Sequence, residues 1–144
     1  MNTPKWLAIA VEELCTGIGE VPGDGDNPRI VEYHSATSLK ATDDEVSWCS
    51  SFANWCMKQG GIEGTHNAAA RSWMQWGRGL SQPRVGCIVV FKRGTSAWQG
   101  HVAFYLGTTA LGNLVCLGGN QSDRVSVTVL LKESLLGYRW PDAP

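Results

Sequence analysis

The apolar residues of this chain change their spacing a little past its middle. Before residue 83 they recur every three or four positions, as on one face of a helix. After residue 83 they form short runs bounded by Gly, Asn and Ser, a pattern typical of strands. The predicted helices cover residues 4–14, 29–33, a segment that follows 42–47, and 67–76. The predicted strands cover residues 87–91, 101–106, 114–117, 125–129 and 136–140.

The order of these elements, with helices first and strands second, predicts the fold class. It favours an α+β fold in which N-terminal helices pack on a C-terminal antiparallel sheet of about five strands. Short turns between the strands favour a meander, in which each strand pairs with the next. No repeat, low-complexity tract or Pro- and Ser-rich linker divides the 144 residues, so we expect a single domain over residues 1–144.

Composition and charge exclude several classes of function. Hydrophobic residues make up 43% of the chain and charged residues 17%, and 12 basic against 13 acidic side chains leave a formal net charge of -1. This balance offers no electrostatic footprint for nucleic acid or for an anionic membrane. No apolar run approaches the ~20 residues of a membrane span, and Glu12 and Glu13 close the short run at 7–11. We therefore expect synthesis in the cytoplasm without a signal peptide and no stable membrane insertion.

The cysteines indicate a reducing compartment. Their number is odd, and no two have the Cys-x-x-Cys spacing of zinc or redox motifs. Two of them would lie about two turns apart on one helix, too far for a disulfide. We expect five free thiols, most of them small core residues. They are Cys15, Cys49, Cys56, Cys87 and Cys116.

One cysteine, Cys49, stands where the third helix is expected to begin. The N–H groups of a first helical turn and the helix dipole stabilise a thiolate at that place. Such a thiolate is a nucleophile when a base reaches it. The alternative is that Cys49 only begins a buried stripe with Phe52 and Cys56.

A histidine at the start of a strand is the best candidate for the base. His34 and His66 are expected at the surface, whereas His101 opens the strand at 101–106. In an antiparallel pair the end of one strand faces the start of its neighbour. The turn after the strand at 114–117 therefore brings Asn120 or Gln121 near His101, where an amide could orient the imidazole.

These residues belong to motifs with a known order. The chain resembles the CHAP and NlpC-type cysteine amidohydrolases and peptidases, a papain-like superfamily that cuts peptidoglycan. The resemblance runs from Trp6 to Trp140. It rests on Trp-Cys-Ser-x-Phe at 48–52, Pro-Arg-Val-Gly-Cys at 83–87, Gly-His-Val-Ala-Phe-Tyr at 100–105 and Leu-Gly-Gly-Asn-Gln-Ser at 117–122. Segments 20–23 and 27–31 are similar to a branch found in small phage lysis proteins.

The resemblance implies a fold, a reaction and a site. The fold is papain-like, with Cys49 as nucleophile, His101 as base and Asn120 as the orienting group. The reaction is hydrolysis of a peptidoglycan amide bond, either within the stem peptide or as an N-acetylmuramoyl-L-alanine amidase. No metal or other cofactor is implied. The chain departs from the family at Cys87, where an acidic residue is common.

Tryptophans next to the candidate catalytic residues could bind substrate. The chain has seven, of which Trp48 precedes Cys49 and Trp98 lies shortly before His101. Apolar walls of this kind fit sugar faces or peptide stems. With Gln121 they form the expected substrate-binding set. The tryptophans expected in the core are Trp6, Trp55, Trp73 and Trp140.

Two alternatives and several partners stay open from the sequence. The same fold could serve as a non-catalytic wall-binding or interaction module. Asp24 and Asp26 could supply oxygens to calcium, although turn chemistry alone explains them. A lytic enzyme of this kind, a phage endolysin or a related effector, would reach the wall through a holin-type pore or by delivery as a toxin. An immunity or inhibitor protein is a further possible partner, and we expect a monomer.

Overall fold

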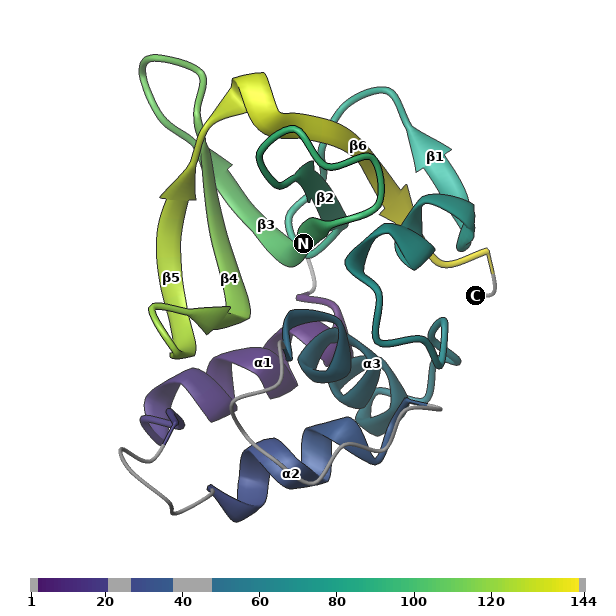
Figure 1. Ribbon diagram of the computed structural model, residues 1–144, viewed down its shortest axis with the longest axis vertical. Coiled ribbons are helices and arrows are strands. Elements are labelled where there is room, and N and C mark those ends of the chain that lie inside the picture. The colour runs from purple at the N-terminus through teal and green to yellow at the C-terminus, as the bar shows by residue number, and fades with distance from the viewer. Residues whose placement is uncertain (1–2, 21–26, 38–47, 143–144) are drawn as a thin grey trace.

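The computed structural model describes residues 3–20, 27–37 and 48–142. These described residues form three α-helices, two short 3-10 helices and six strands (Figure 1). The helices are α1 (Lys5–Cys15), α2 (Pro28–His34), α3 (Cys49–Gln59), η1 (Ala70–Gln75) and η2 (Lys132–Ser134). The strands are β1 (Arg78–Leu80), β2 (Ile88–Lys92), β3 (Gly100–Thr108), β4 (Leu114–Gln121), β5 (Arg124–Leu130) and β6 (Leu135–Trp140).

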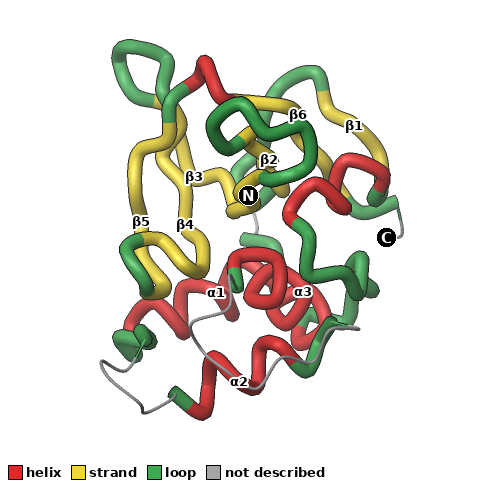
Figure 2. The backbone as a smooth tube through the Cα atoms, in the orientation of Figure 1, coloured by secondary structure: helices red, strands yellow, loops and turns green. Residues whose placement is uncertain are grey.

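The segregation of helices and strands expected from the sequence is present. The three α-helices form one layer, and the sheet lies above them in the view of Figure 2. The fold is α+β, as predicted. Asp24, Asp26 and the segment 42–47 lie outside the described residues.

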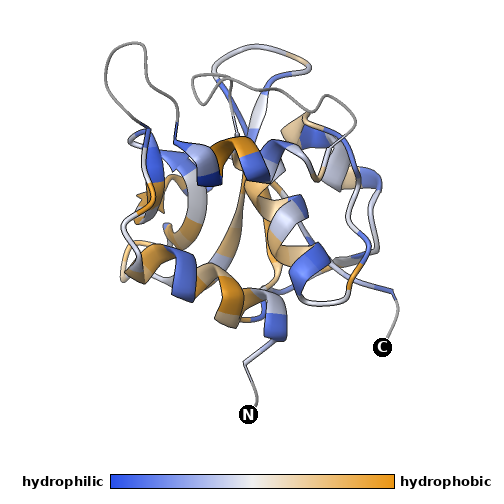
Figure 3. Cartoon of the chain, turned by 90° about the horizontal axis from the view of Figure 1, so that it is seen from below, coloured by the Kyte–Doolittle hydropathy of each residue, from blue (hydrophilic) through white to orange (hydrophobic). Residues whose placement is uncertain are grey.

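Local sequence explains where the helices begin and end. The Asn27 side chain accepts a hydrogen bond from the backbone N–H of Arg29 at 2.8 Å and so caps α2, whose first residue is Pro28. Helix α3 begins at Cys49, where the sequence predicted it, and it is followed by Gly60. In Figure 3 the helices carry both hydrophobic and hydrophilic residues along their length, as amphipathic helices do. The segment expected to be helical at 67–76 is a 3-10 helix over part of its length.

The sheet differs from the expected meander in one respect. Its strand order is β1-β6-β2-β3-β4-β5, and all neighbours are antiparallel. Strands β2 to β5 follow one another as a meander. Strand β6, the last in the chain, lies instead between β1 and β2. The prediction missed this return because β1 is a strand of three residues, too short to give a sequence pattern.

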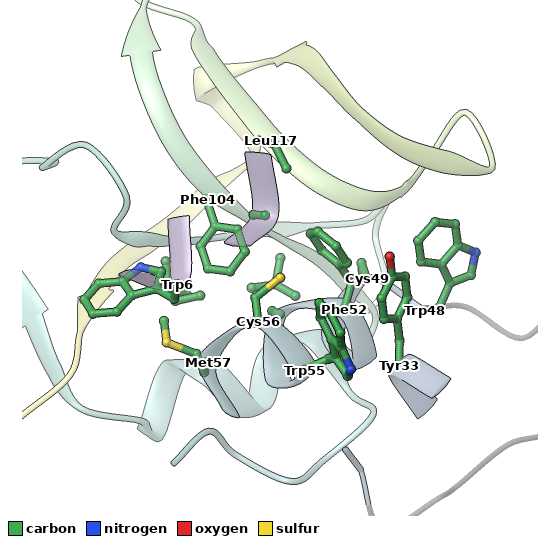
Figure 4. Close-up of a cluster of buried hydrophobic side chains, with 14 of the residues drawn as sticks. Trp6, Tyr33, Trp48, Cys49, Phe52, Trp55, Cys56, Met57, Phe104 and Leu117 are labelled. Carbon is green, nitrogen blue, oxygen red and sulfur yellow. The ribbon is translucent and has the colours of Figure 1, made fainter. Parts of the chain in front are cut away.

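The core has two parts, one on each face of the sheet. The larger part lies between the helices and the sheet, where Phe52 and Cys56 of α3 meet Phe104 and Leu117 (Figure 4). The smaller part lies on the opposite face. Its buried members are Cys87, Val89, Phe91, Ala103, Tyr105, Leu114 and Cys116.

One histidine expected at the surface is buried. The His34 side chain is inaccessible to solvent, and its Nδ1 lies 2.8 Å from the Ser51 hydroxyl of α3. His34 ends α2, which packs on α3, so the contact between the two helices covers it. The surface prediction was therefore wrong for His34. It is confirmed for His66, whose side chain is 60% exposed.

Candidate active site

The candidate nucleophile is the first residue of α3. Cys49 is only 2% exposed and follows Trp48 at the N-cap position. The Trp48 side chain makes no capping hydrogen bond. The Cys49 thiol therefore lies at the positive end of the helix dipole, where a negative charge is stabilised. All five cysteines are free, and Cys15 is the exposed one.

The candidate base lies on β3, directly after its first residue. His101 is 8% exposed, and its strand position opposite Phe91 of β2 fixes its backbone. The ring atom Nε2 lies 2.9 Å from Oε1 of Gln121. The other ring atom, Nδ1, is buried and makes no well-formed hydrogen bond to another described residue. Because Nε2 is engaged by Gln121, we infer that Nδ1 is the ring atom on the side of the Cys49 thiol.

The tautomer of His101 follows from the contacts of Gln121. The side-chain Nε2 of Gln121 donates to the carbonyl of Ser126 at 2.6 Å and to that of Cys116 at 3.3 Å. These two bonds leave Oε1 as the atom that faces the imidazole, and an amide oxygen can only accept. The neutral ring therefore carries its proton on Nε2. Its Nδ1 then has a lone pair available for the proton of Cys49.

Electrostatics favour ionisation of this pair. Burial opposes a charge on Cys49, but the nearby imidazole of His101, the backbone N–H of Val102 and the charge of Arg93 together lower the pKa of the thiol. Burial likewise opposes a charge on His101, but Cys49 and Gln121 raise the pKa of the imidazole. Both shifts favour a thiolate beside an imidazolium.

The remaining buried cysteines show how burial changes the pKa of a thiol that has no histidine beside it. Burial raises the pKa of Cys87 to about 11 and that of Cys116 to about 12. It also raises the pKa of Cys56 well above its ordinary value. Cys56 lies on the same face of α3 as Cys49, two turns further along. The two thiols differ in their neighbours: His101, the backbone N–H of Val102 and Arg93 lower the pKa of Cys49, whereas the charge of Glu13 adds to the effect of burial at Cys56.

The pH dependence of thiolate formation tests this electrostatic reading. We expect the ultraviolet thiolate absorbance that is lost in Cys49→Ala to persist at pH values below the ordinary thiol range. In His101→Ala the same absorbance should appear only at higher pH, because burial then acts on the thiol without the imidazole of His101 to offset it. An unchanged midpoint in His101→Ala would contradict the proposed pairing.

An irregularity in β4 decides which amide faces His101. Two residues of β4, Gly119 and Asn120, lie opposite a single residue of β5, Val125. Asn120 has a φ of 58°, in the left-handed region, and this β-bulge adds one residue to the strand. The extra residue turns the side chain of Gln121 onto the face of the sheet that carries His101. Regular alternation would have placed Asn120 there.

The amide bound to His101 is thus that of Gln121, a residue that the sequence assigned to substrate binding. Asn120, the expected orienting residue, is half-buried within the bulge. The sequence predicted that this turn lies near His101, but its pattern did not distinguish Asn120 from Gln121 as the residue that contacts the imidazole. Consecutive glycines inside an apolar strand pattern are the signal for the bulge.

Two substitutions separate the roles of the neighbouring amides. Gln121→Ala is expected to lower kcat for hydrolysis about 10- to 100-fold, because the imidazole loses the acceptor that fixes its orientation. Asn120→Gly should stay within a few-fold of the wild type, since glycine adopts a positive φ and keeps the bulge. Steady-state kinetics would measure both. A larger loss in Asn120→Gly than in Gln121→Ala would assign the role to Asn120.

Trp48 is a core residue, not part of a substrate surface. It is 0% exposed, its ring stacks on Tyr33 at a centroid distance of 5.9 Å, and its Nε1 donates to Glu20 at 2.9 Å. Figure 4 shows Trp48 and Tyr33 beside the start of α3. A Cβ atom added at Gly119 would lie 2.7 Å from the Trp48 ring and from Phe52. The close contact of β4 with this ring therefore fixes the start of α3 against the sheet, and the expectation that Trp48 lines a cleft is corrected.

Trp98 has the opposite environment. It is 73% exposed and lies in the loop between β2 and β3, on the wall of a surface groove. His101 and Gln121 line a separate, smaller cavity of about 420 Å³ with Arg93. Arg93 is exposed and its charge lowers the pKa of Cys49. Sequence analysis missed Arg93, because a lone arginine after a strand carries no recognisable pattern.

Among the helices that the structure describes, none has the length and apolar character to cross a bilayer. Within residues 3–20, 27–37 and 48–142, no group of three or more His, Cys, Asp or Glu side chains is arranged to hold a metal ion.

Comparison with known families matches part of the chain to one domain family. The profile of the CHAP domain matches residues 41–120, which is more than half of the chain and includes Cys49 and His101. CHAP domains are typically cysteine- and histidine-dependent amidohydrolases, and their activity is directed at peptidoglycan. No curated protein matches the chain. On the family match, this chain belongs to the CHAP domain family.

Proposed function

We propose that this protein hydrolyses an amide bond of peptidoglycan through a thiol mechanism, with Cys49 as nucleophile and His101 as base. The observation that carries the proposal is the arrangement of three side chains. Cys49 lies at a helix N-terminus beside His101, and the far side of the imidazole is bound by Gln121 at 2.9 Å. A thiol, a base and a group that orients the base are the three parts of a cysteine hydrolase site.

The first step forms a thioester. His101 Nδ1 takes the proton of Cys49, and the thiolate sulfur attacks the carbonyl carbon of the scissile amide. The tetrahedral intermediate then breaks its C–N bond. The leaving nitrogen takes the proton from His101 Nδ1, and the acyl group stays on the sulfur.

The second step releases the acid. Water enters in place of the amine, His101 Nδ1 takes one of its protons, and the hydroxide oxygen attacks the thioester carbon. The C–S bond breaks and the sulfur leaves as thiolate beside the imidazolium, which restores the starting pair. The hydrogen bond from His101 Nε2 to Gln121 holds the imidazole so that Nδ1 points toward the sulfur in both steps. No metal or cofactor takes part.

The negative charge on the carbonyl oxygen needs hydrogen-bond donors. The backbone N–H of Cys49 belongs to the same residue as the attacking sulfur, and it lies in the first turn of α3. The positive end of the helix adds to its effect. We propose this N–H as one donor of the oxyanion site.

The biological setting proposed here is lysis of a bacterial cell wall. The bond is either a peptide bond within the stem or the bond between N-acetylmuramic acid and L-alanine. The resemblance to small phage lysis proteins favours an endolysin or a related effector, released through a holin-type pore or delivered as a toxin. Its site of action is then the wall, on the periplasmic side of the membrane.

The test is digestion of purified peptidoglycan, followed by mass spectrometry of the soluble products. Cys49→Ala is the matched control, since it removes the sulfur alone. Fragments with new amino groups on stem peptides would mean an endopeptidase, and intact stems freed from glycan would mean an amidase. If the wild type and Cys49→Ala release nothing from several wall types, the hydrolase is rejected in favour of a non-catalytic wall-binding module.

A further inference from the structure

A second cavity lies beside the candidate active site and has no part in the chemistry described above. It is a surface groove of about 820 Å³ between η1, the loop that joins β2 to β3, and β6. We call it the η1 groove. This volume is within the range of small-molecule sites in proteins. The residues that matter for the argument are Asn67, Arg71, Gln75, Trp76 and Trp98.

The η1 groove is linked to both members of the catalytic pair. The carbonyl of Asn67, which lines the groove, accepts a hydrogen bond from the hydroxyl of Ser50 at 2.7 Å, and Ser50 follows Cys49. On the other side, Nε of Arg71 donates to the carbonyl of Gln99 at 2.7 Å, two residues before His101. A polymer with its scissile bond at Cys49 therefore has this groove as a neighbouring surface.

The exposed tryptophan of the groove is held on an ordered loop. Arg71 also donates from Nη2 to the carbonyl of Ser96 at 2.8 Å. The Ser96 hydroxyl accepts from the backbone N–H groups of Trp98 at 3.2 Å and Gln99 at 3.0 Å. The loop is thus fixed on both sides of a ring that is itself 73% exposed. A large exposed apolar side chain on a rigid backbone is a feature of binding sites.

The polar groups of the groove are mostly neutral. Asn67, Ser72, Thr65 and Gln75 present amides and hydroxyls, and the guanidinium of Arg71 already serves two loop carbonyls. No carboxylate lies among the described lining residues. Neutral donors and acceptors beside an indole face suit an uncharged polyol with apolar ring faces. They suit a stem peptide less well, since its carboxylates would need cations.

We propose that the η1 groove binds sugar rings, with Trp98 as the platform on which an N-acetylated hexosamine stacks. The identification of that sugar with the glycan strand of peptidoglycan rests on the proposed function. The groove would then hold the glycan while the neighbouring Cys49 acts on the attached peptide. Binding of sugar and cleavage of the amide are separate properties of the protein.

The test is a titration of the full chain with the tetramer of N-acetylglucosamine, followed by the indole N–H signals in NMR. The Trp98 signal, identified by its loss in Trp98→Tyr, should shift with sugar concentration. Trp98→Ala should raise the dissociation constant for the sugar at least tenfold. Trp98→Tyr should keep it within a few-fold of the wild-type value, because an aromatic face remains. Leu111→Ala is the matched control, because Leu111 is 78% exposed but lies outside the groove.

Three results would overturn the proposal: a Trp98 signal that the sugar leaves unmoved, Trp98→Ala binding as tightly as the wild type, or a sugar-free stem peptide shifting the groove signals in place of the sugar. The titration needs no bond cleavage. Its failure is therefore distinguishable from failure of the hydrolase assay, and either can occur without the other.

Discussion

Replacement of His101 or Cys49 by alanine is expected to lower kcat/KM for peptidoglycan hydrolysis about 10⁴-fold or more. Without the sulfur no thioester forms, and without the imidazole no group removes the thiol proton or protonates the leaving amine. Because the two side chains act as one unit, the double variant should be little worse than either single one. Release of soluble fragments over time, at matched protein concentration, would measure the loss.

Two controls make this result specific. Cys15→Ala removes the exposed thiol and should retain wild-type activity, since Cys15 ends α1 and lies outside the site. Circular dichroism would establish that His101→Ala and Cys49→Ala are folded. If folded His101→Ala keeps activity within tenfold of the wild type, His101 is not the base.

The second large effect concerns stability. Trp48→Ala is expected to lower the free energy of unfolding by about 3–5 kcal/mol, because it empties a fully buried site and removes the ring on which Tyr33 stacks. This loss is a large part of the stability of a typical domain. Trp98→Ala removes the same side chain from an exposed position and should change the free energy by about 0.5 kcal/mol or less. Urea unfolding followed by circular dichroism would compare the two.

The sequence assigned both tryptophans to substrate binding, and this comparison of stabilities separates the buried ring from the exposed one. If Trp48→Ala unfolds in buffer, Trp48→Phe keeps an aromatic ring in the site and provides a measurable intermediate. A stability of Trp48→Ala equal to that of the wild type would show that the ring does not carry the packing at the start of α3.

Most elements of the fold could be predicted because their signals are local. The apolar stripe that begins at Cys49 and the short apolar run that contains Val89 depend only on residues nearby in the chain. The position of β6 depends instead on pairing between distant segments. The sequence pattern of residues 135–140 does not indicate whether this strand pairs with β2, as it does, or with β5. The burial of His34 is of the same kind, since it results from the packing of α2 on α3.

The candidate site was predicted in part for a similar reason. A helix start and a strand start identify Cys49 and His101, because both are positions in regular elements. The choice between Asn120 and Gln121 depends on one bulged residue, and a shift of one residue reverses the face of a side chain. The two tryptophans next to the pair have equal hydrophobicity in the sequence. Only the folded chain separates the buried Trp48 from the exposed Trp98.

The place of β6 has a consequence for the time at which the protein becomes competent during synthesis. Strand β2 pairs on one side with β3 and on the other with β6, which leaves the ribosome last of the strands. Until residues 135–140 emerge, β2 has an open edge, and β1 has no partner in the sheet. The same strand β2 supports His101 through its pairing with Phe91. A ribosome-bound chain therefore carries Cys49, His101 and Gln121 before it has the complete sheet, so we expect these side chains to reach their final arrangement only after residues 135–140 have emerged.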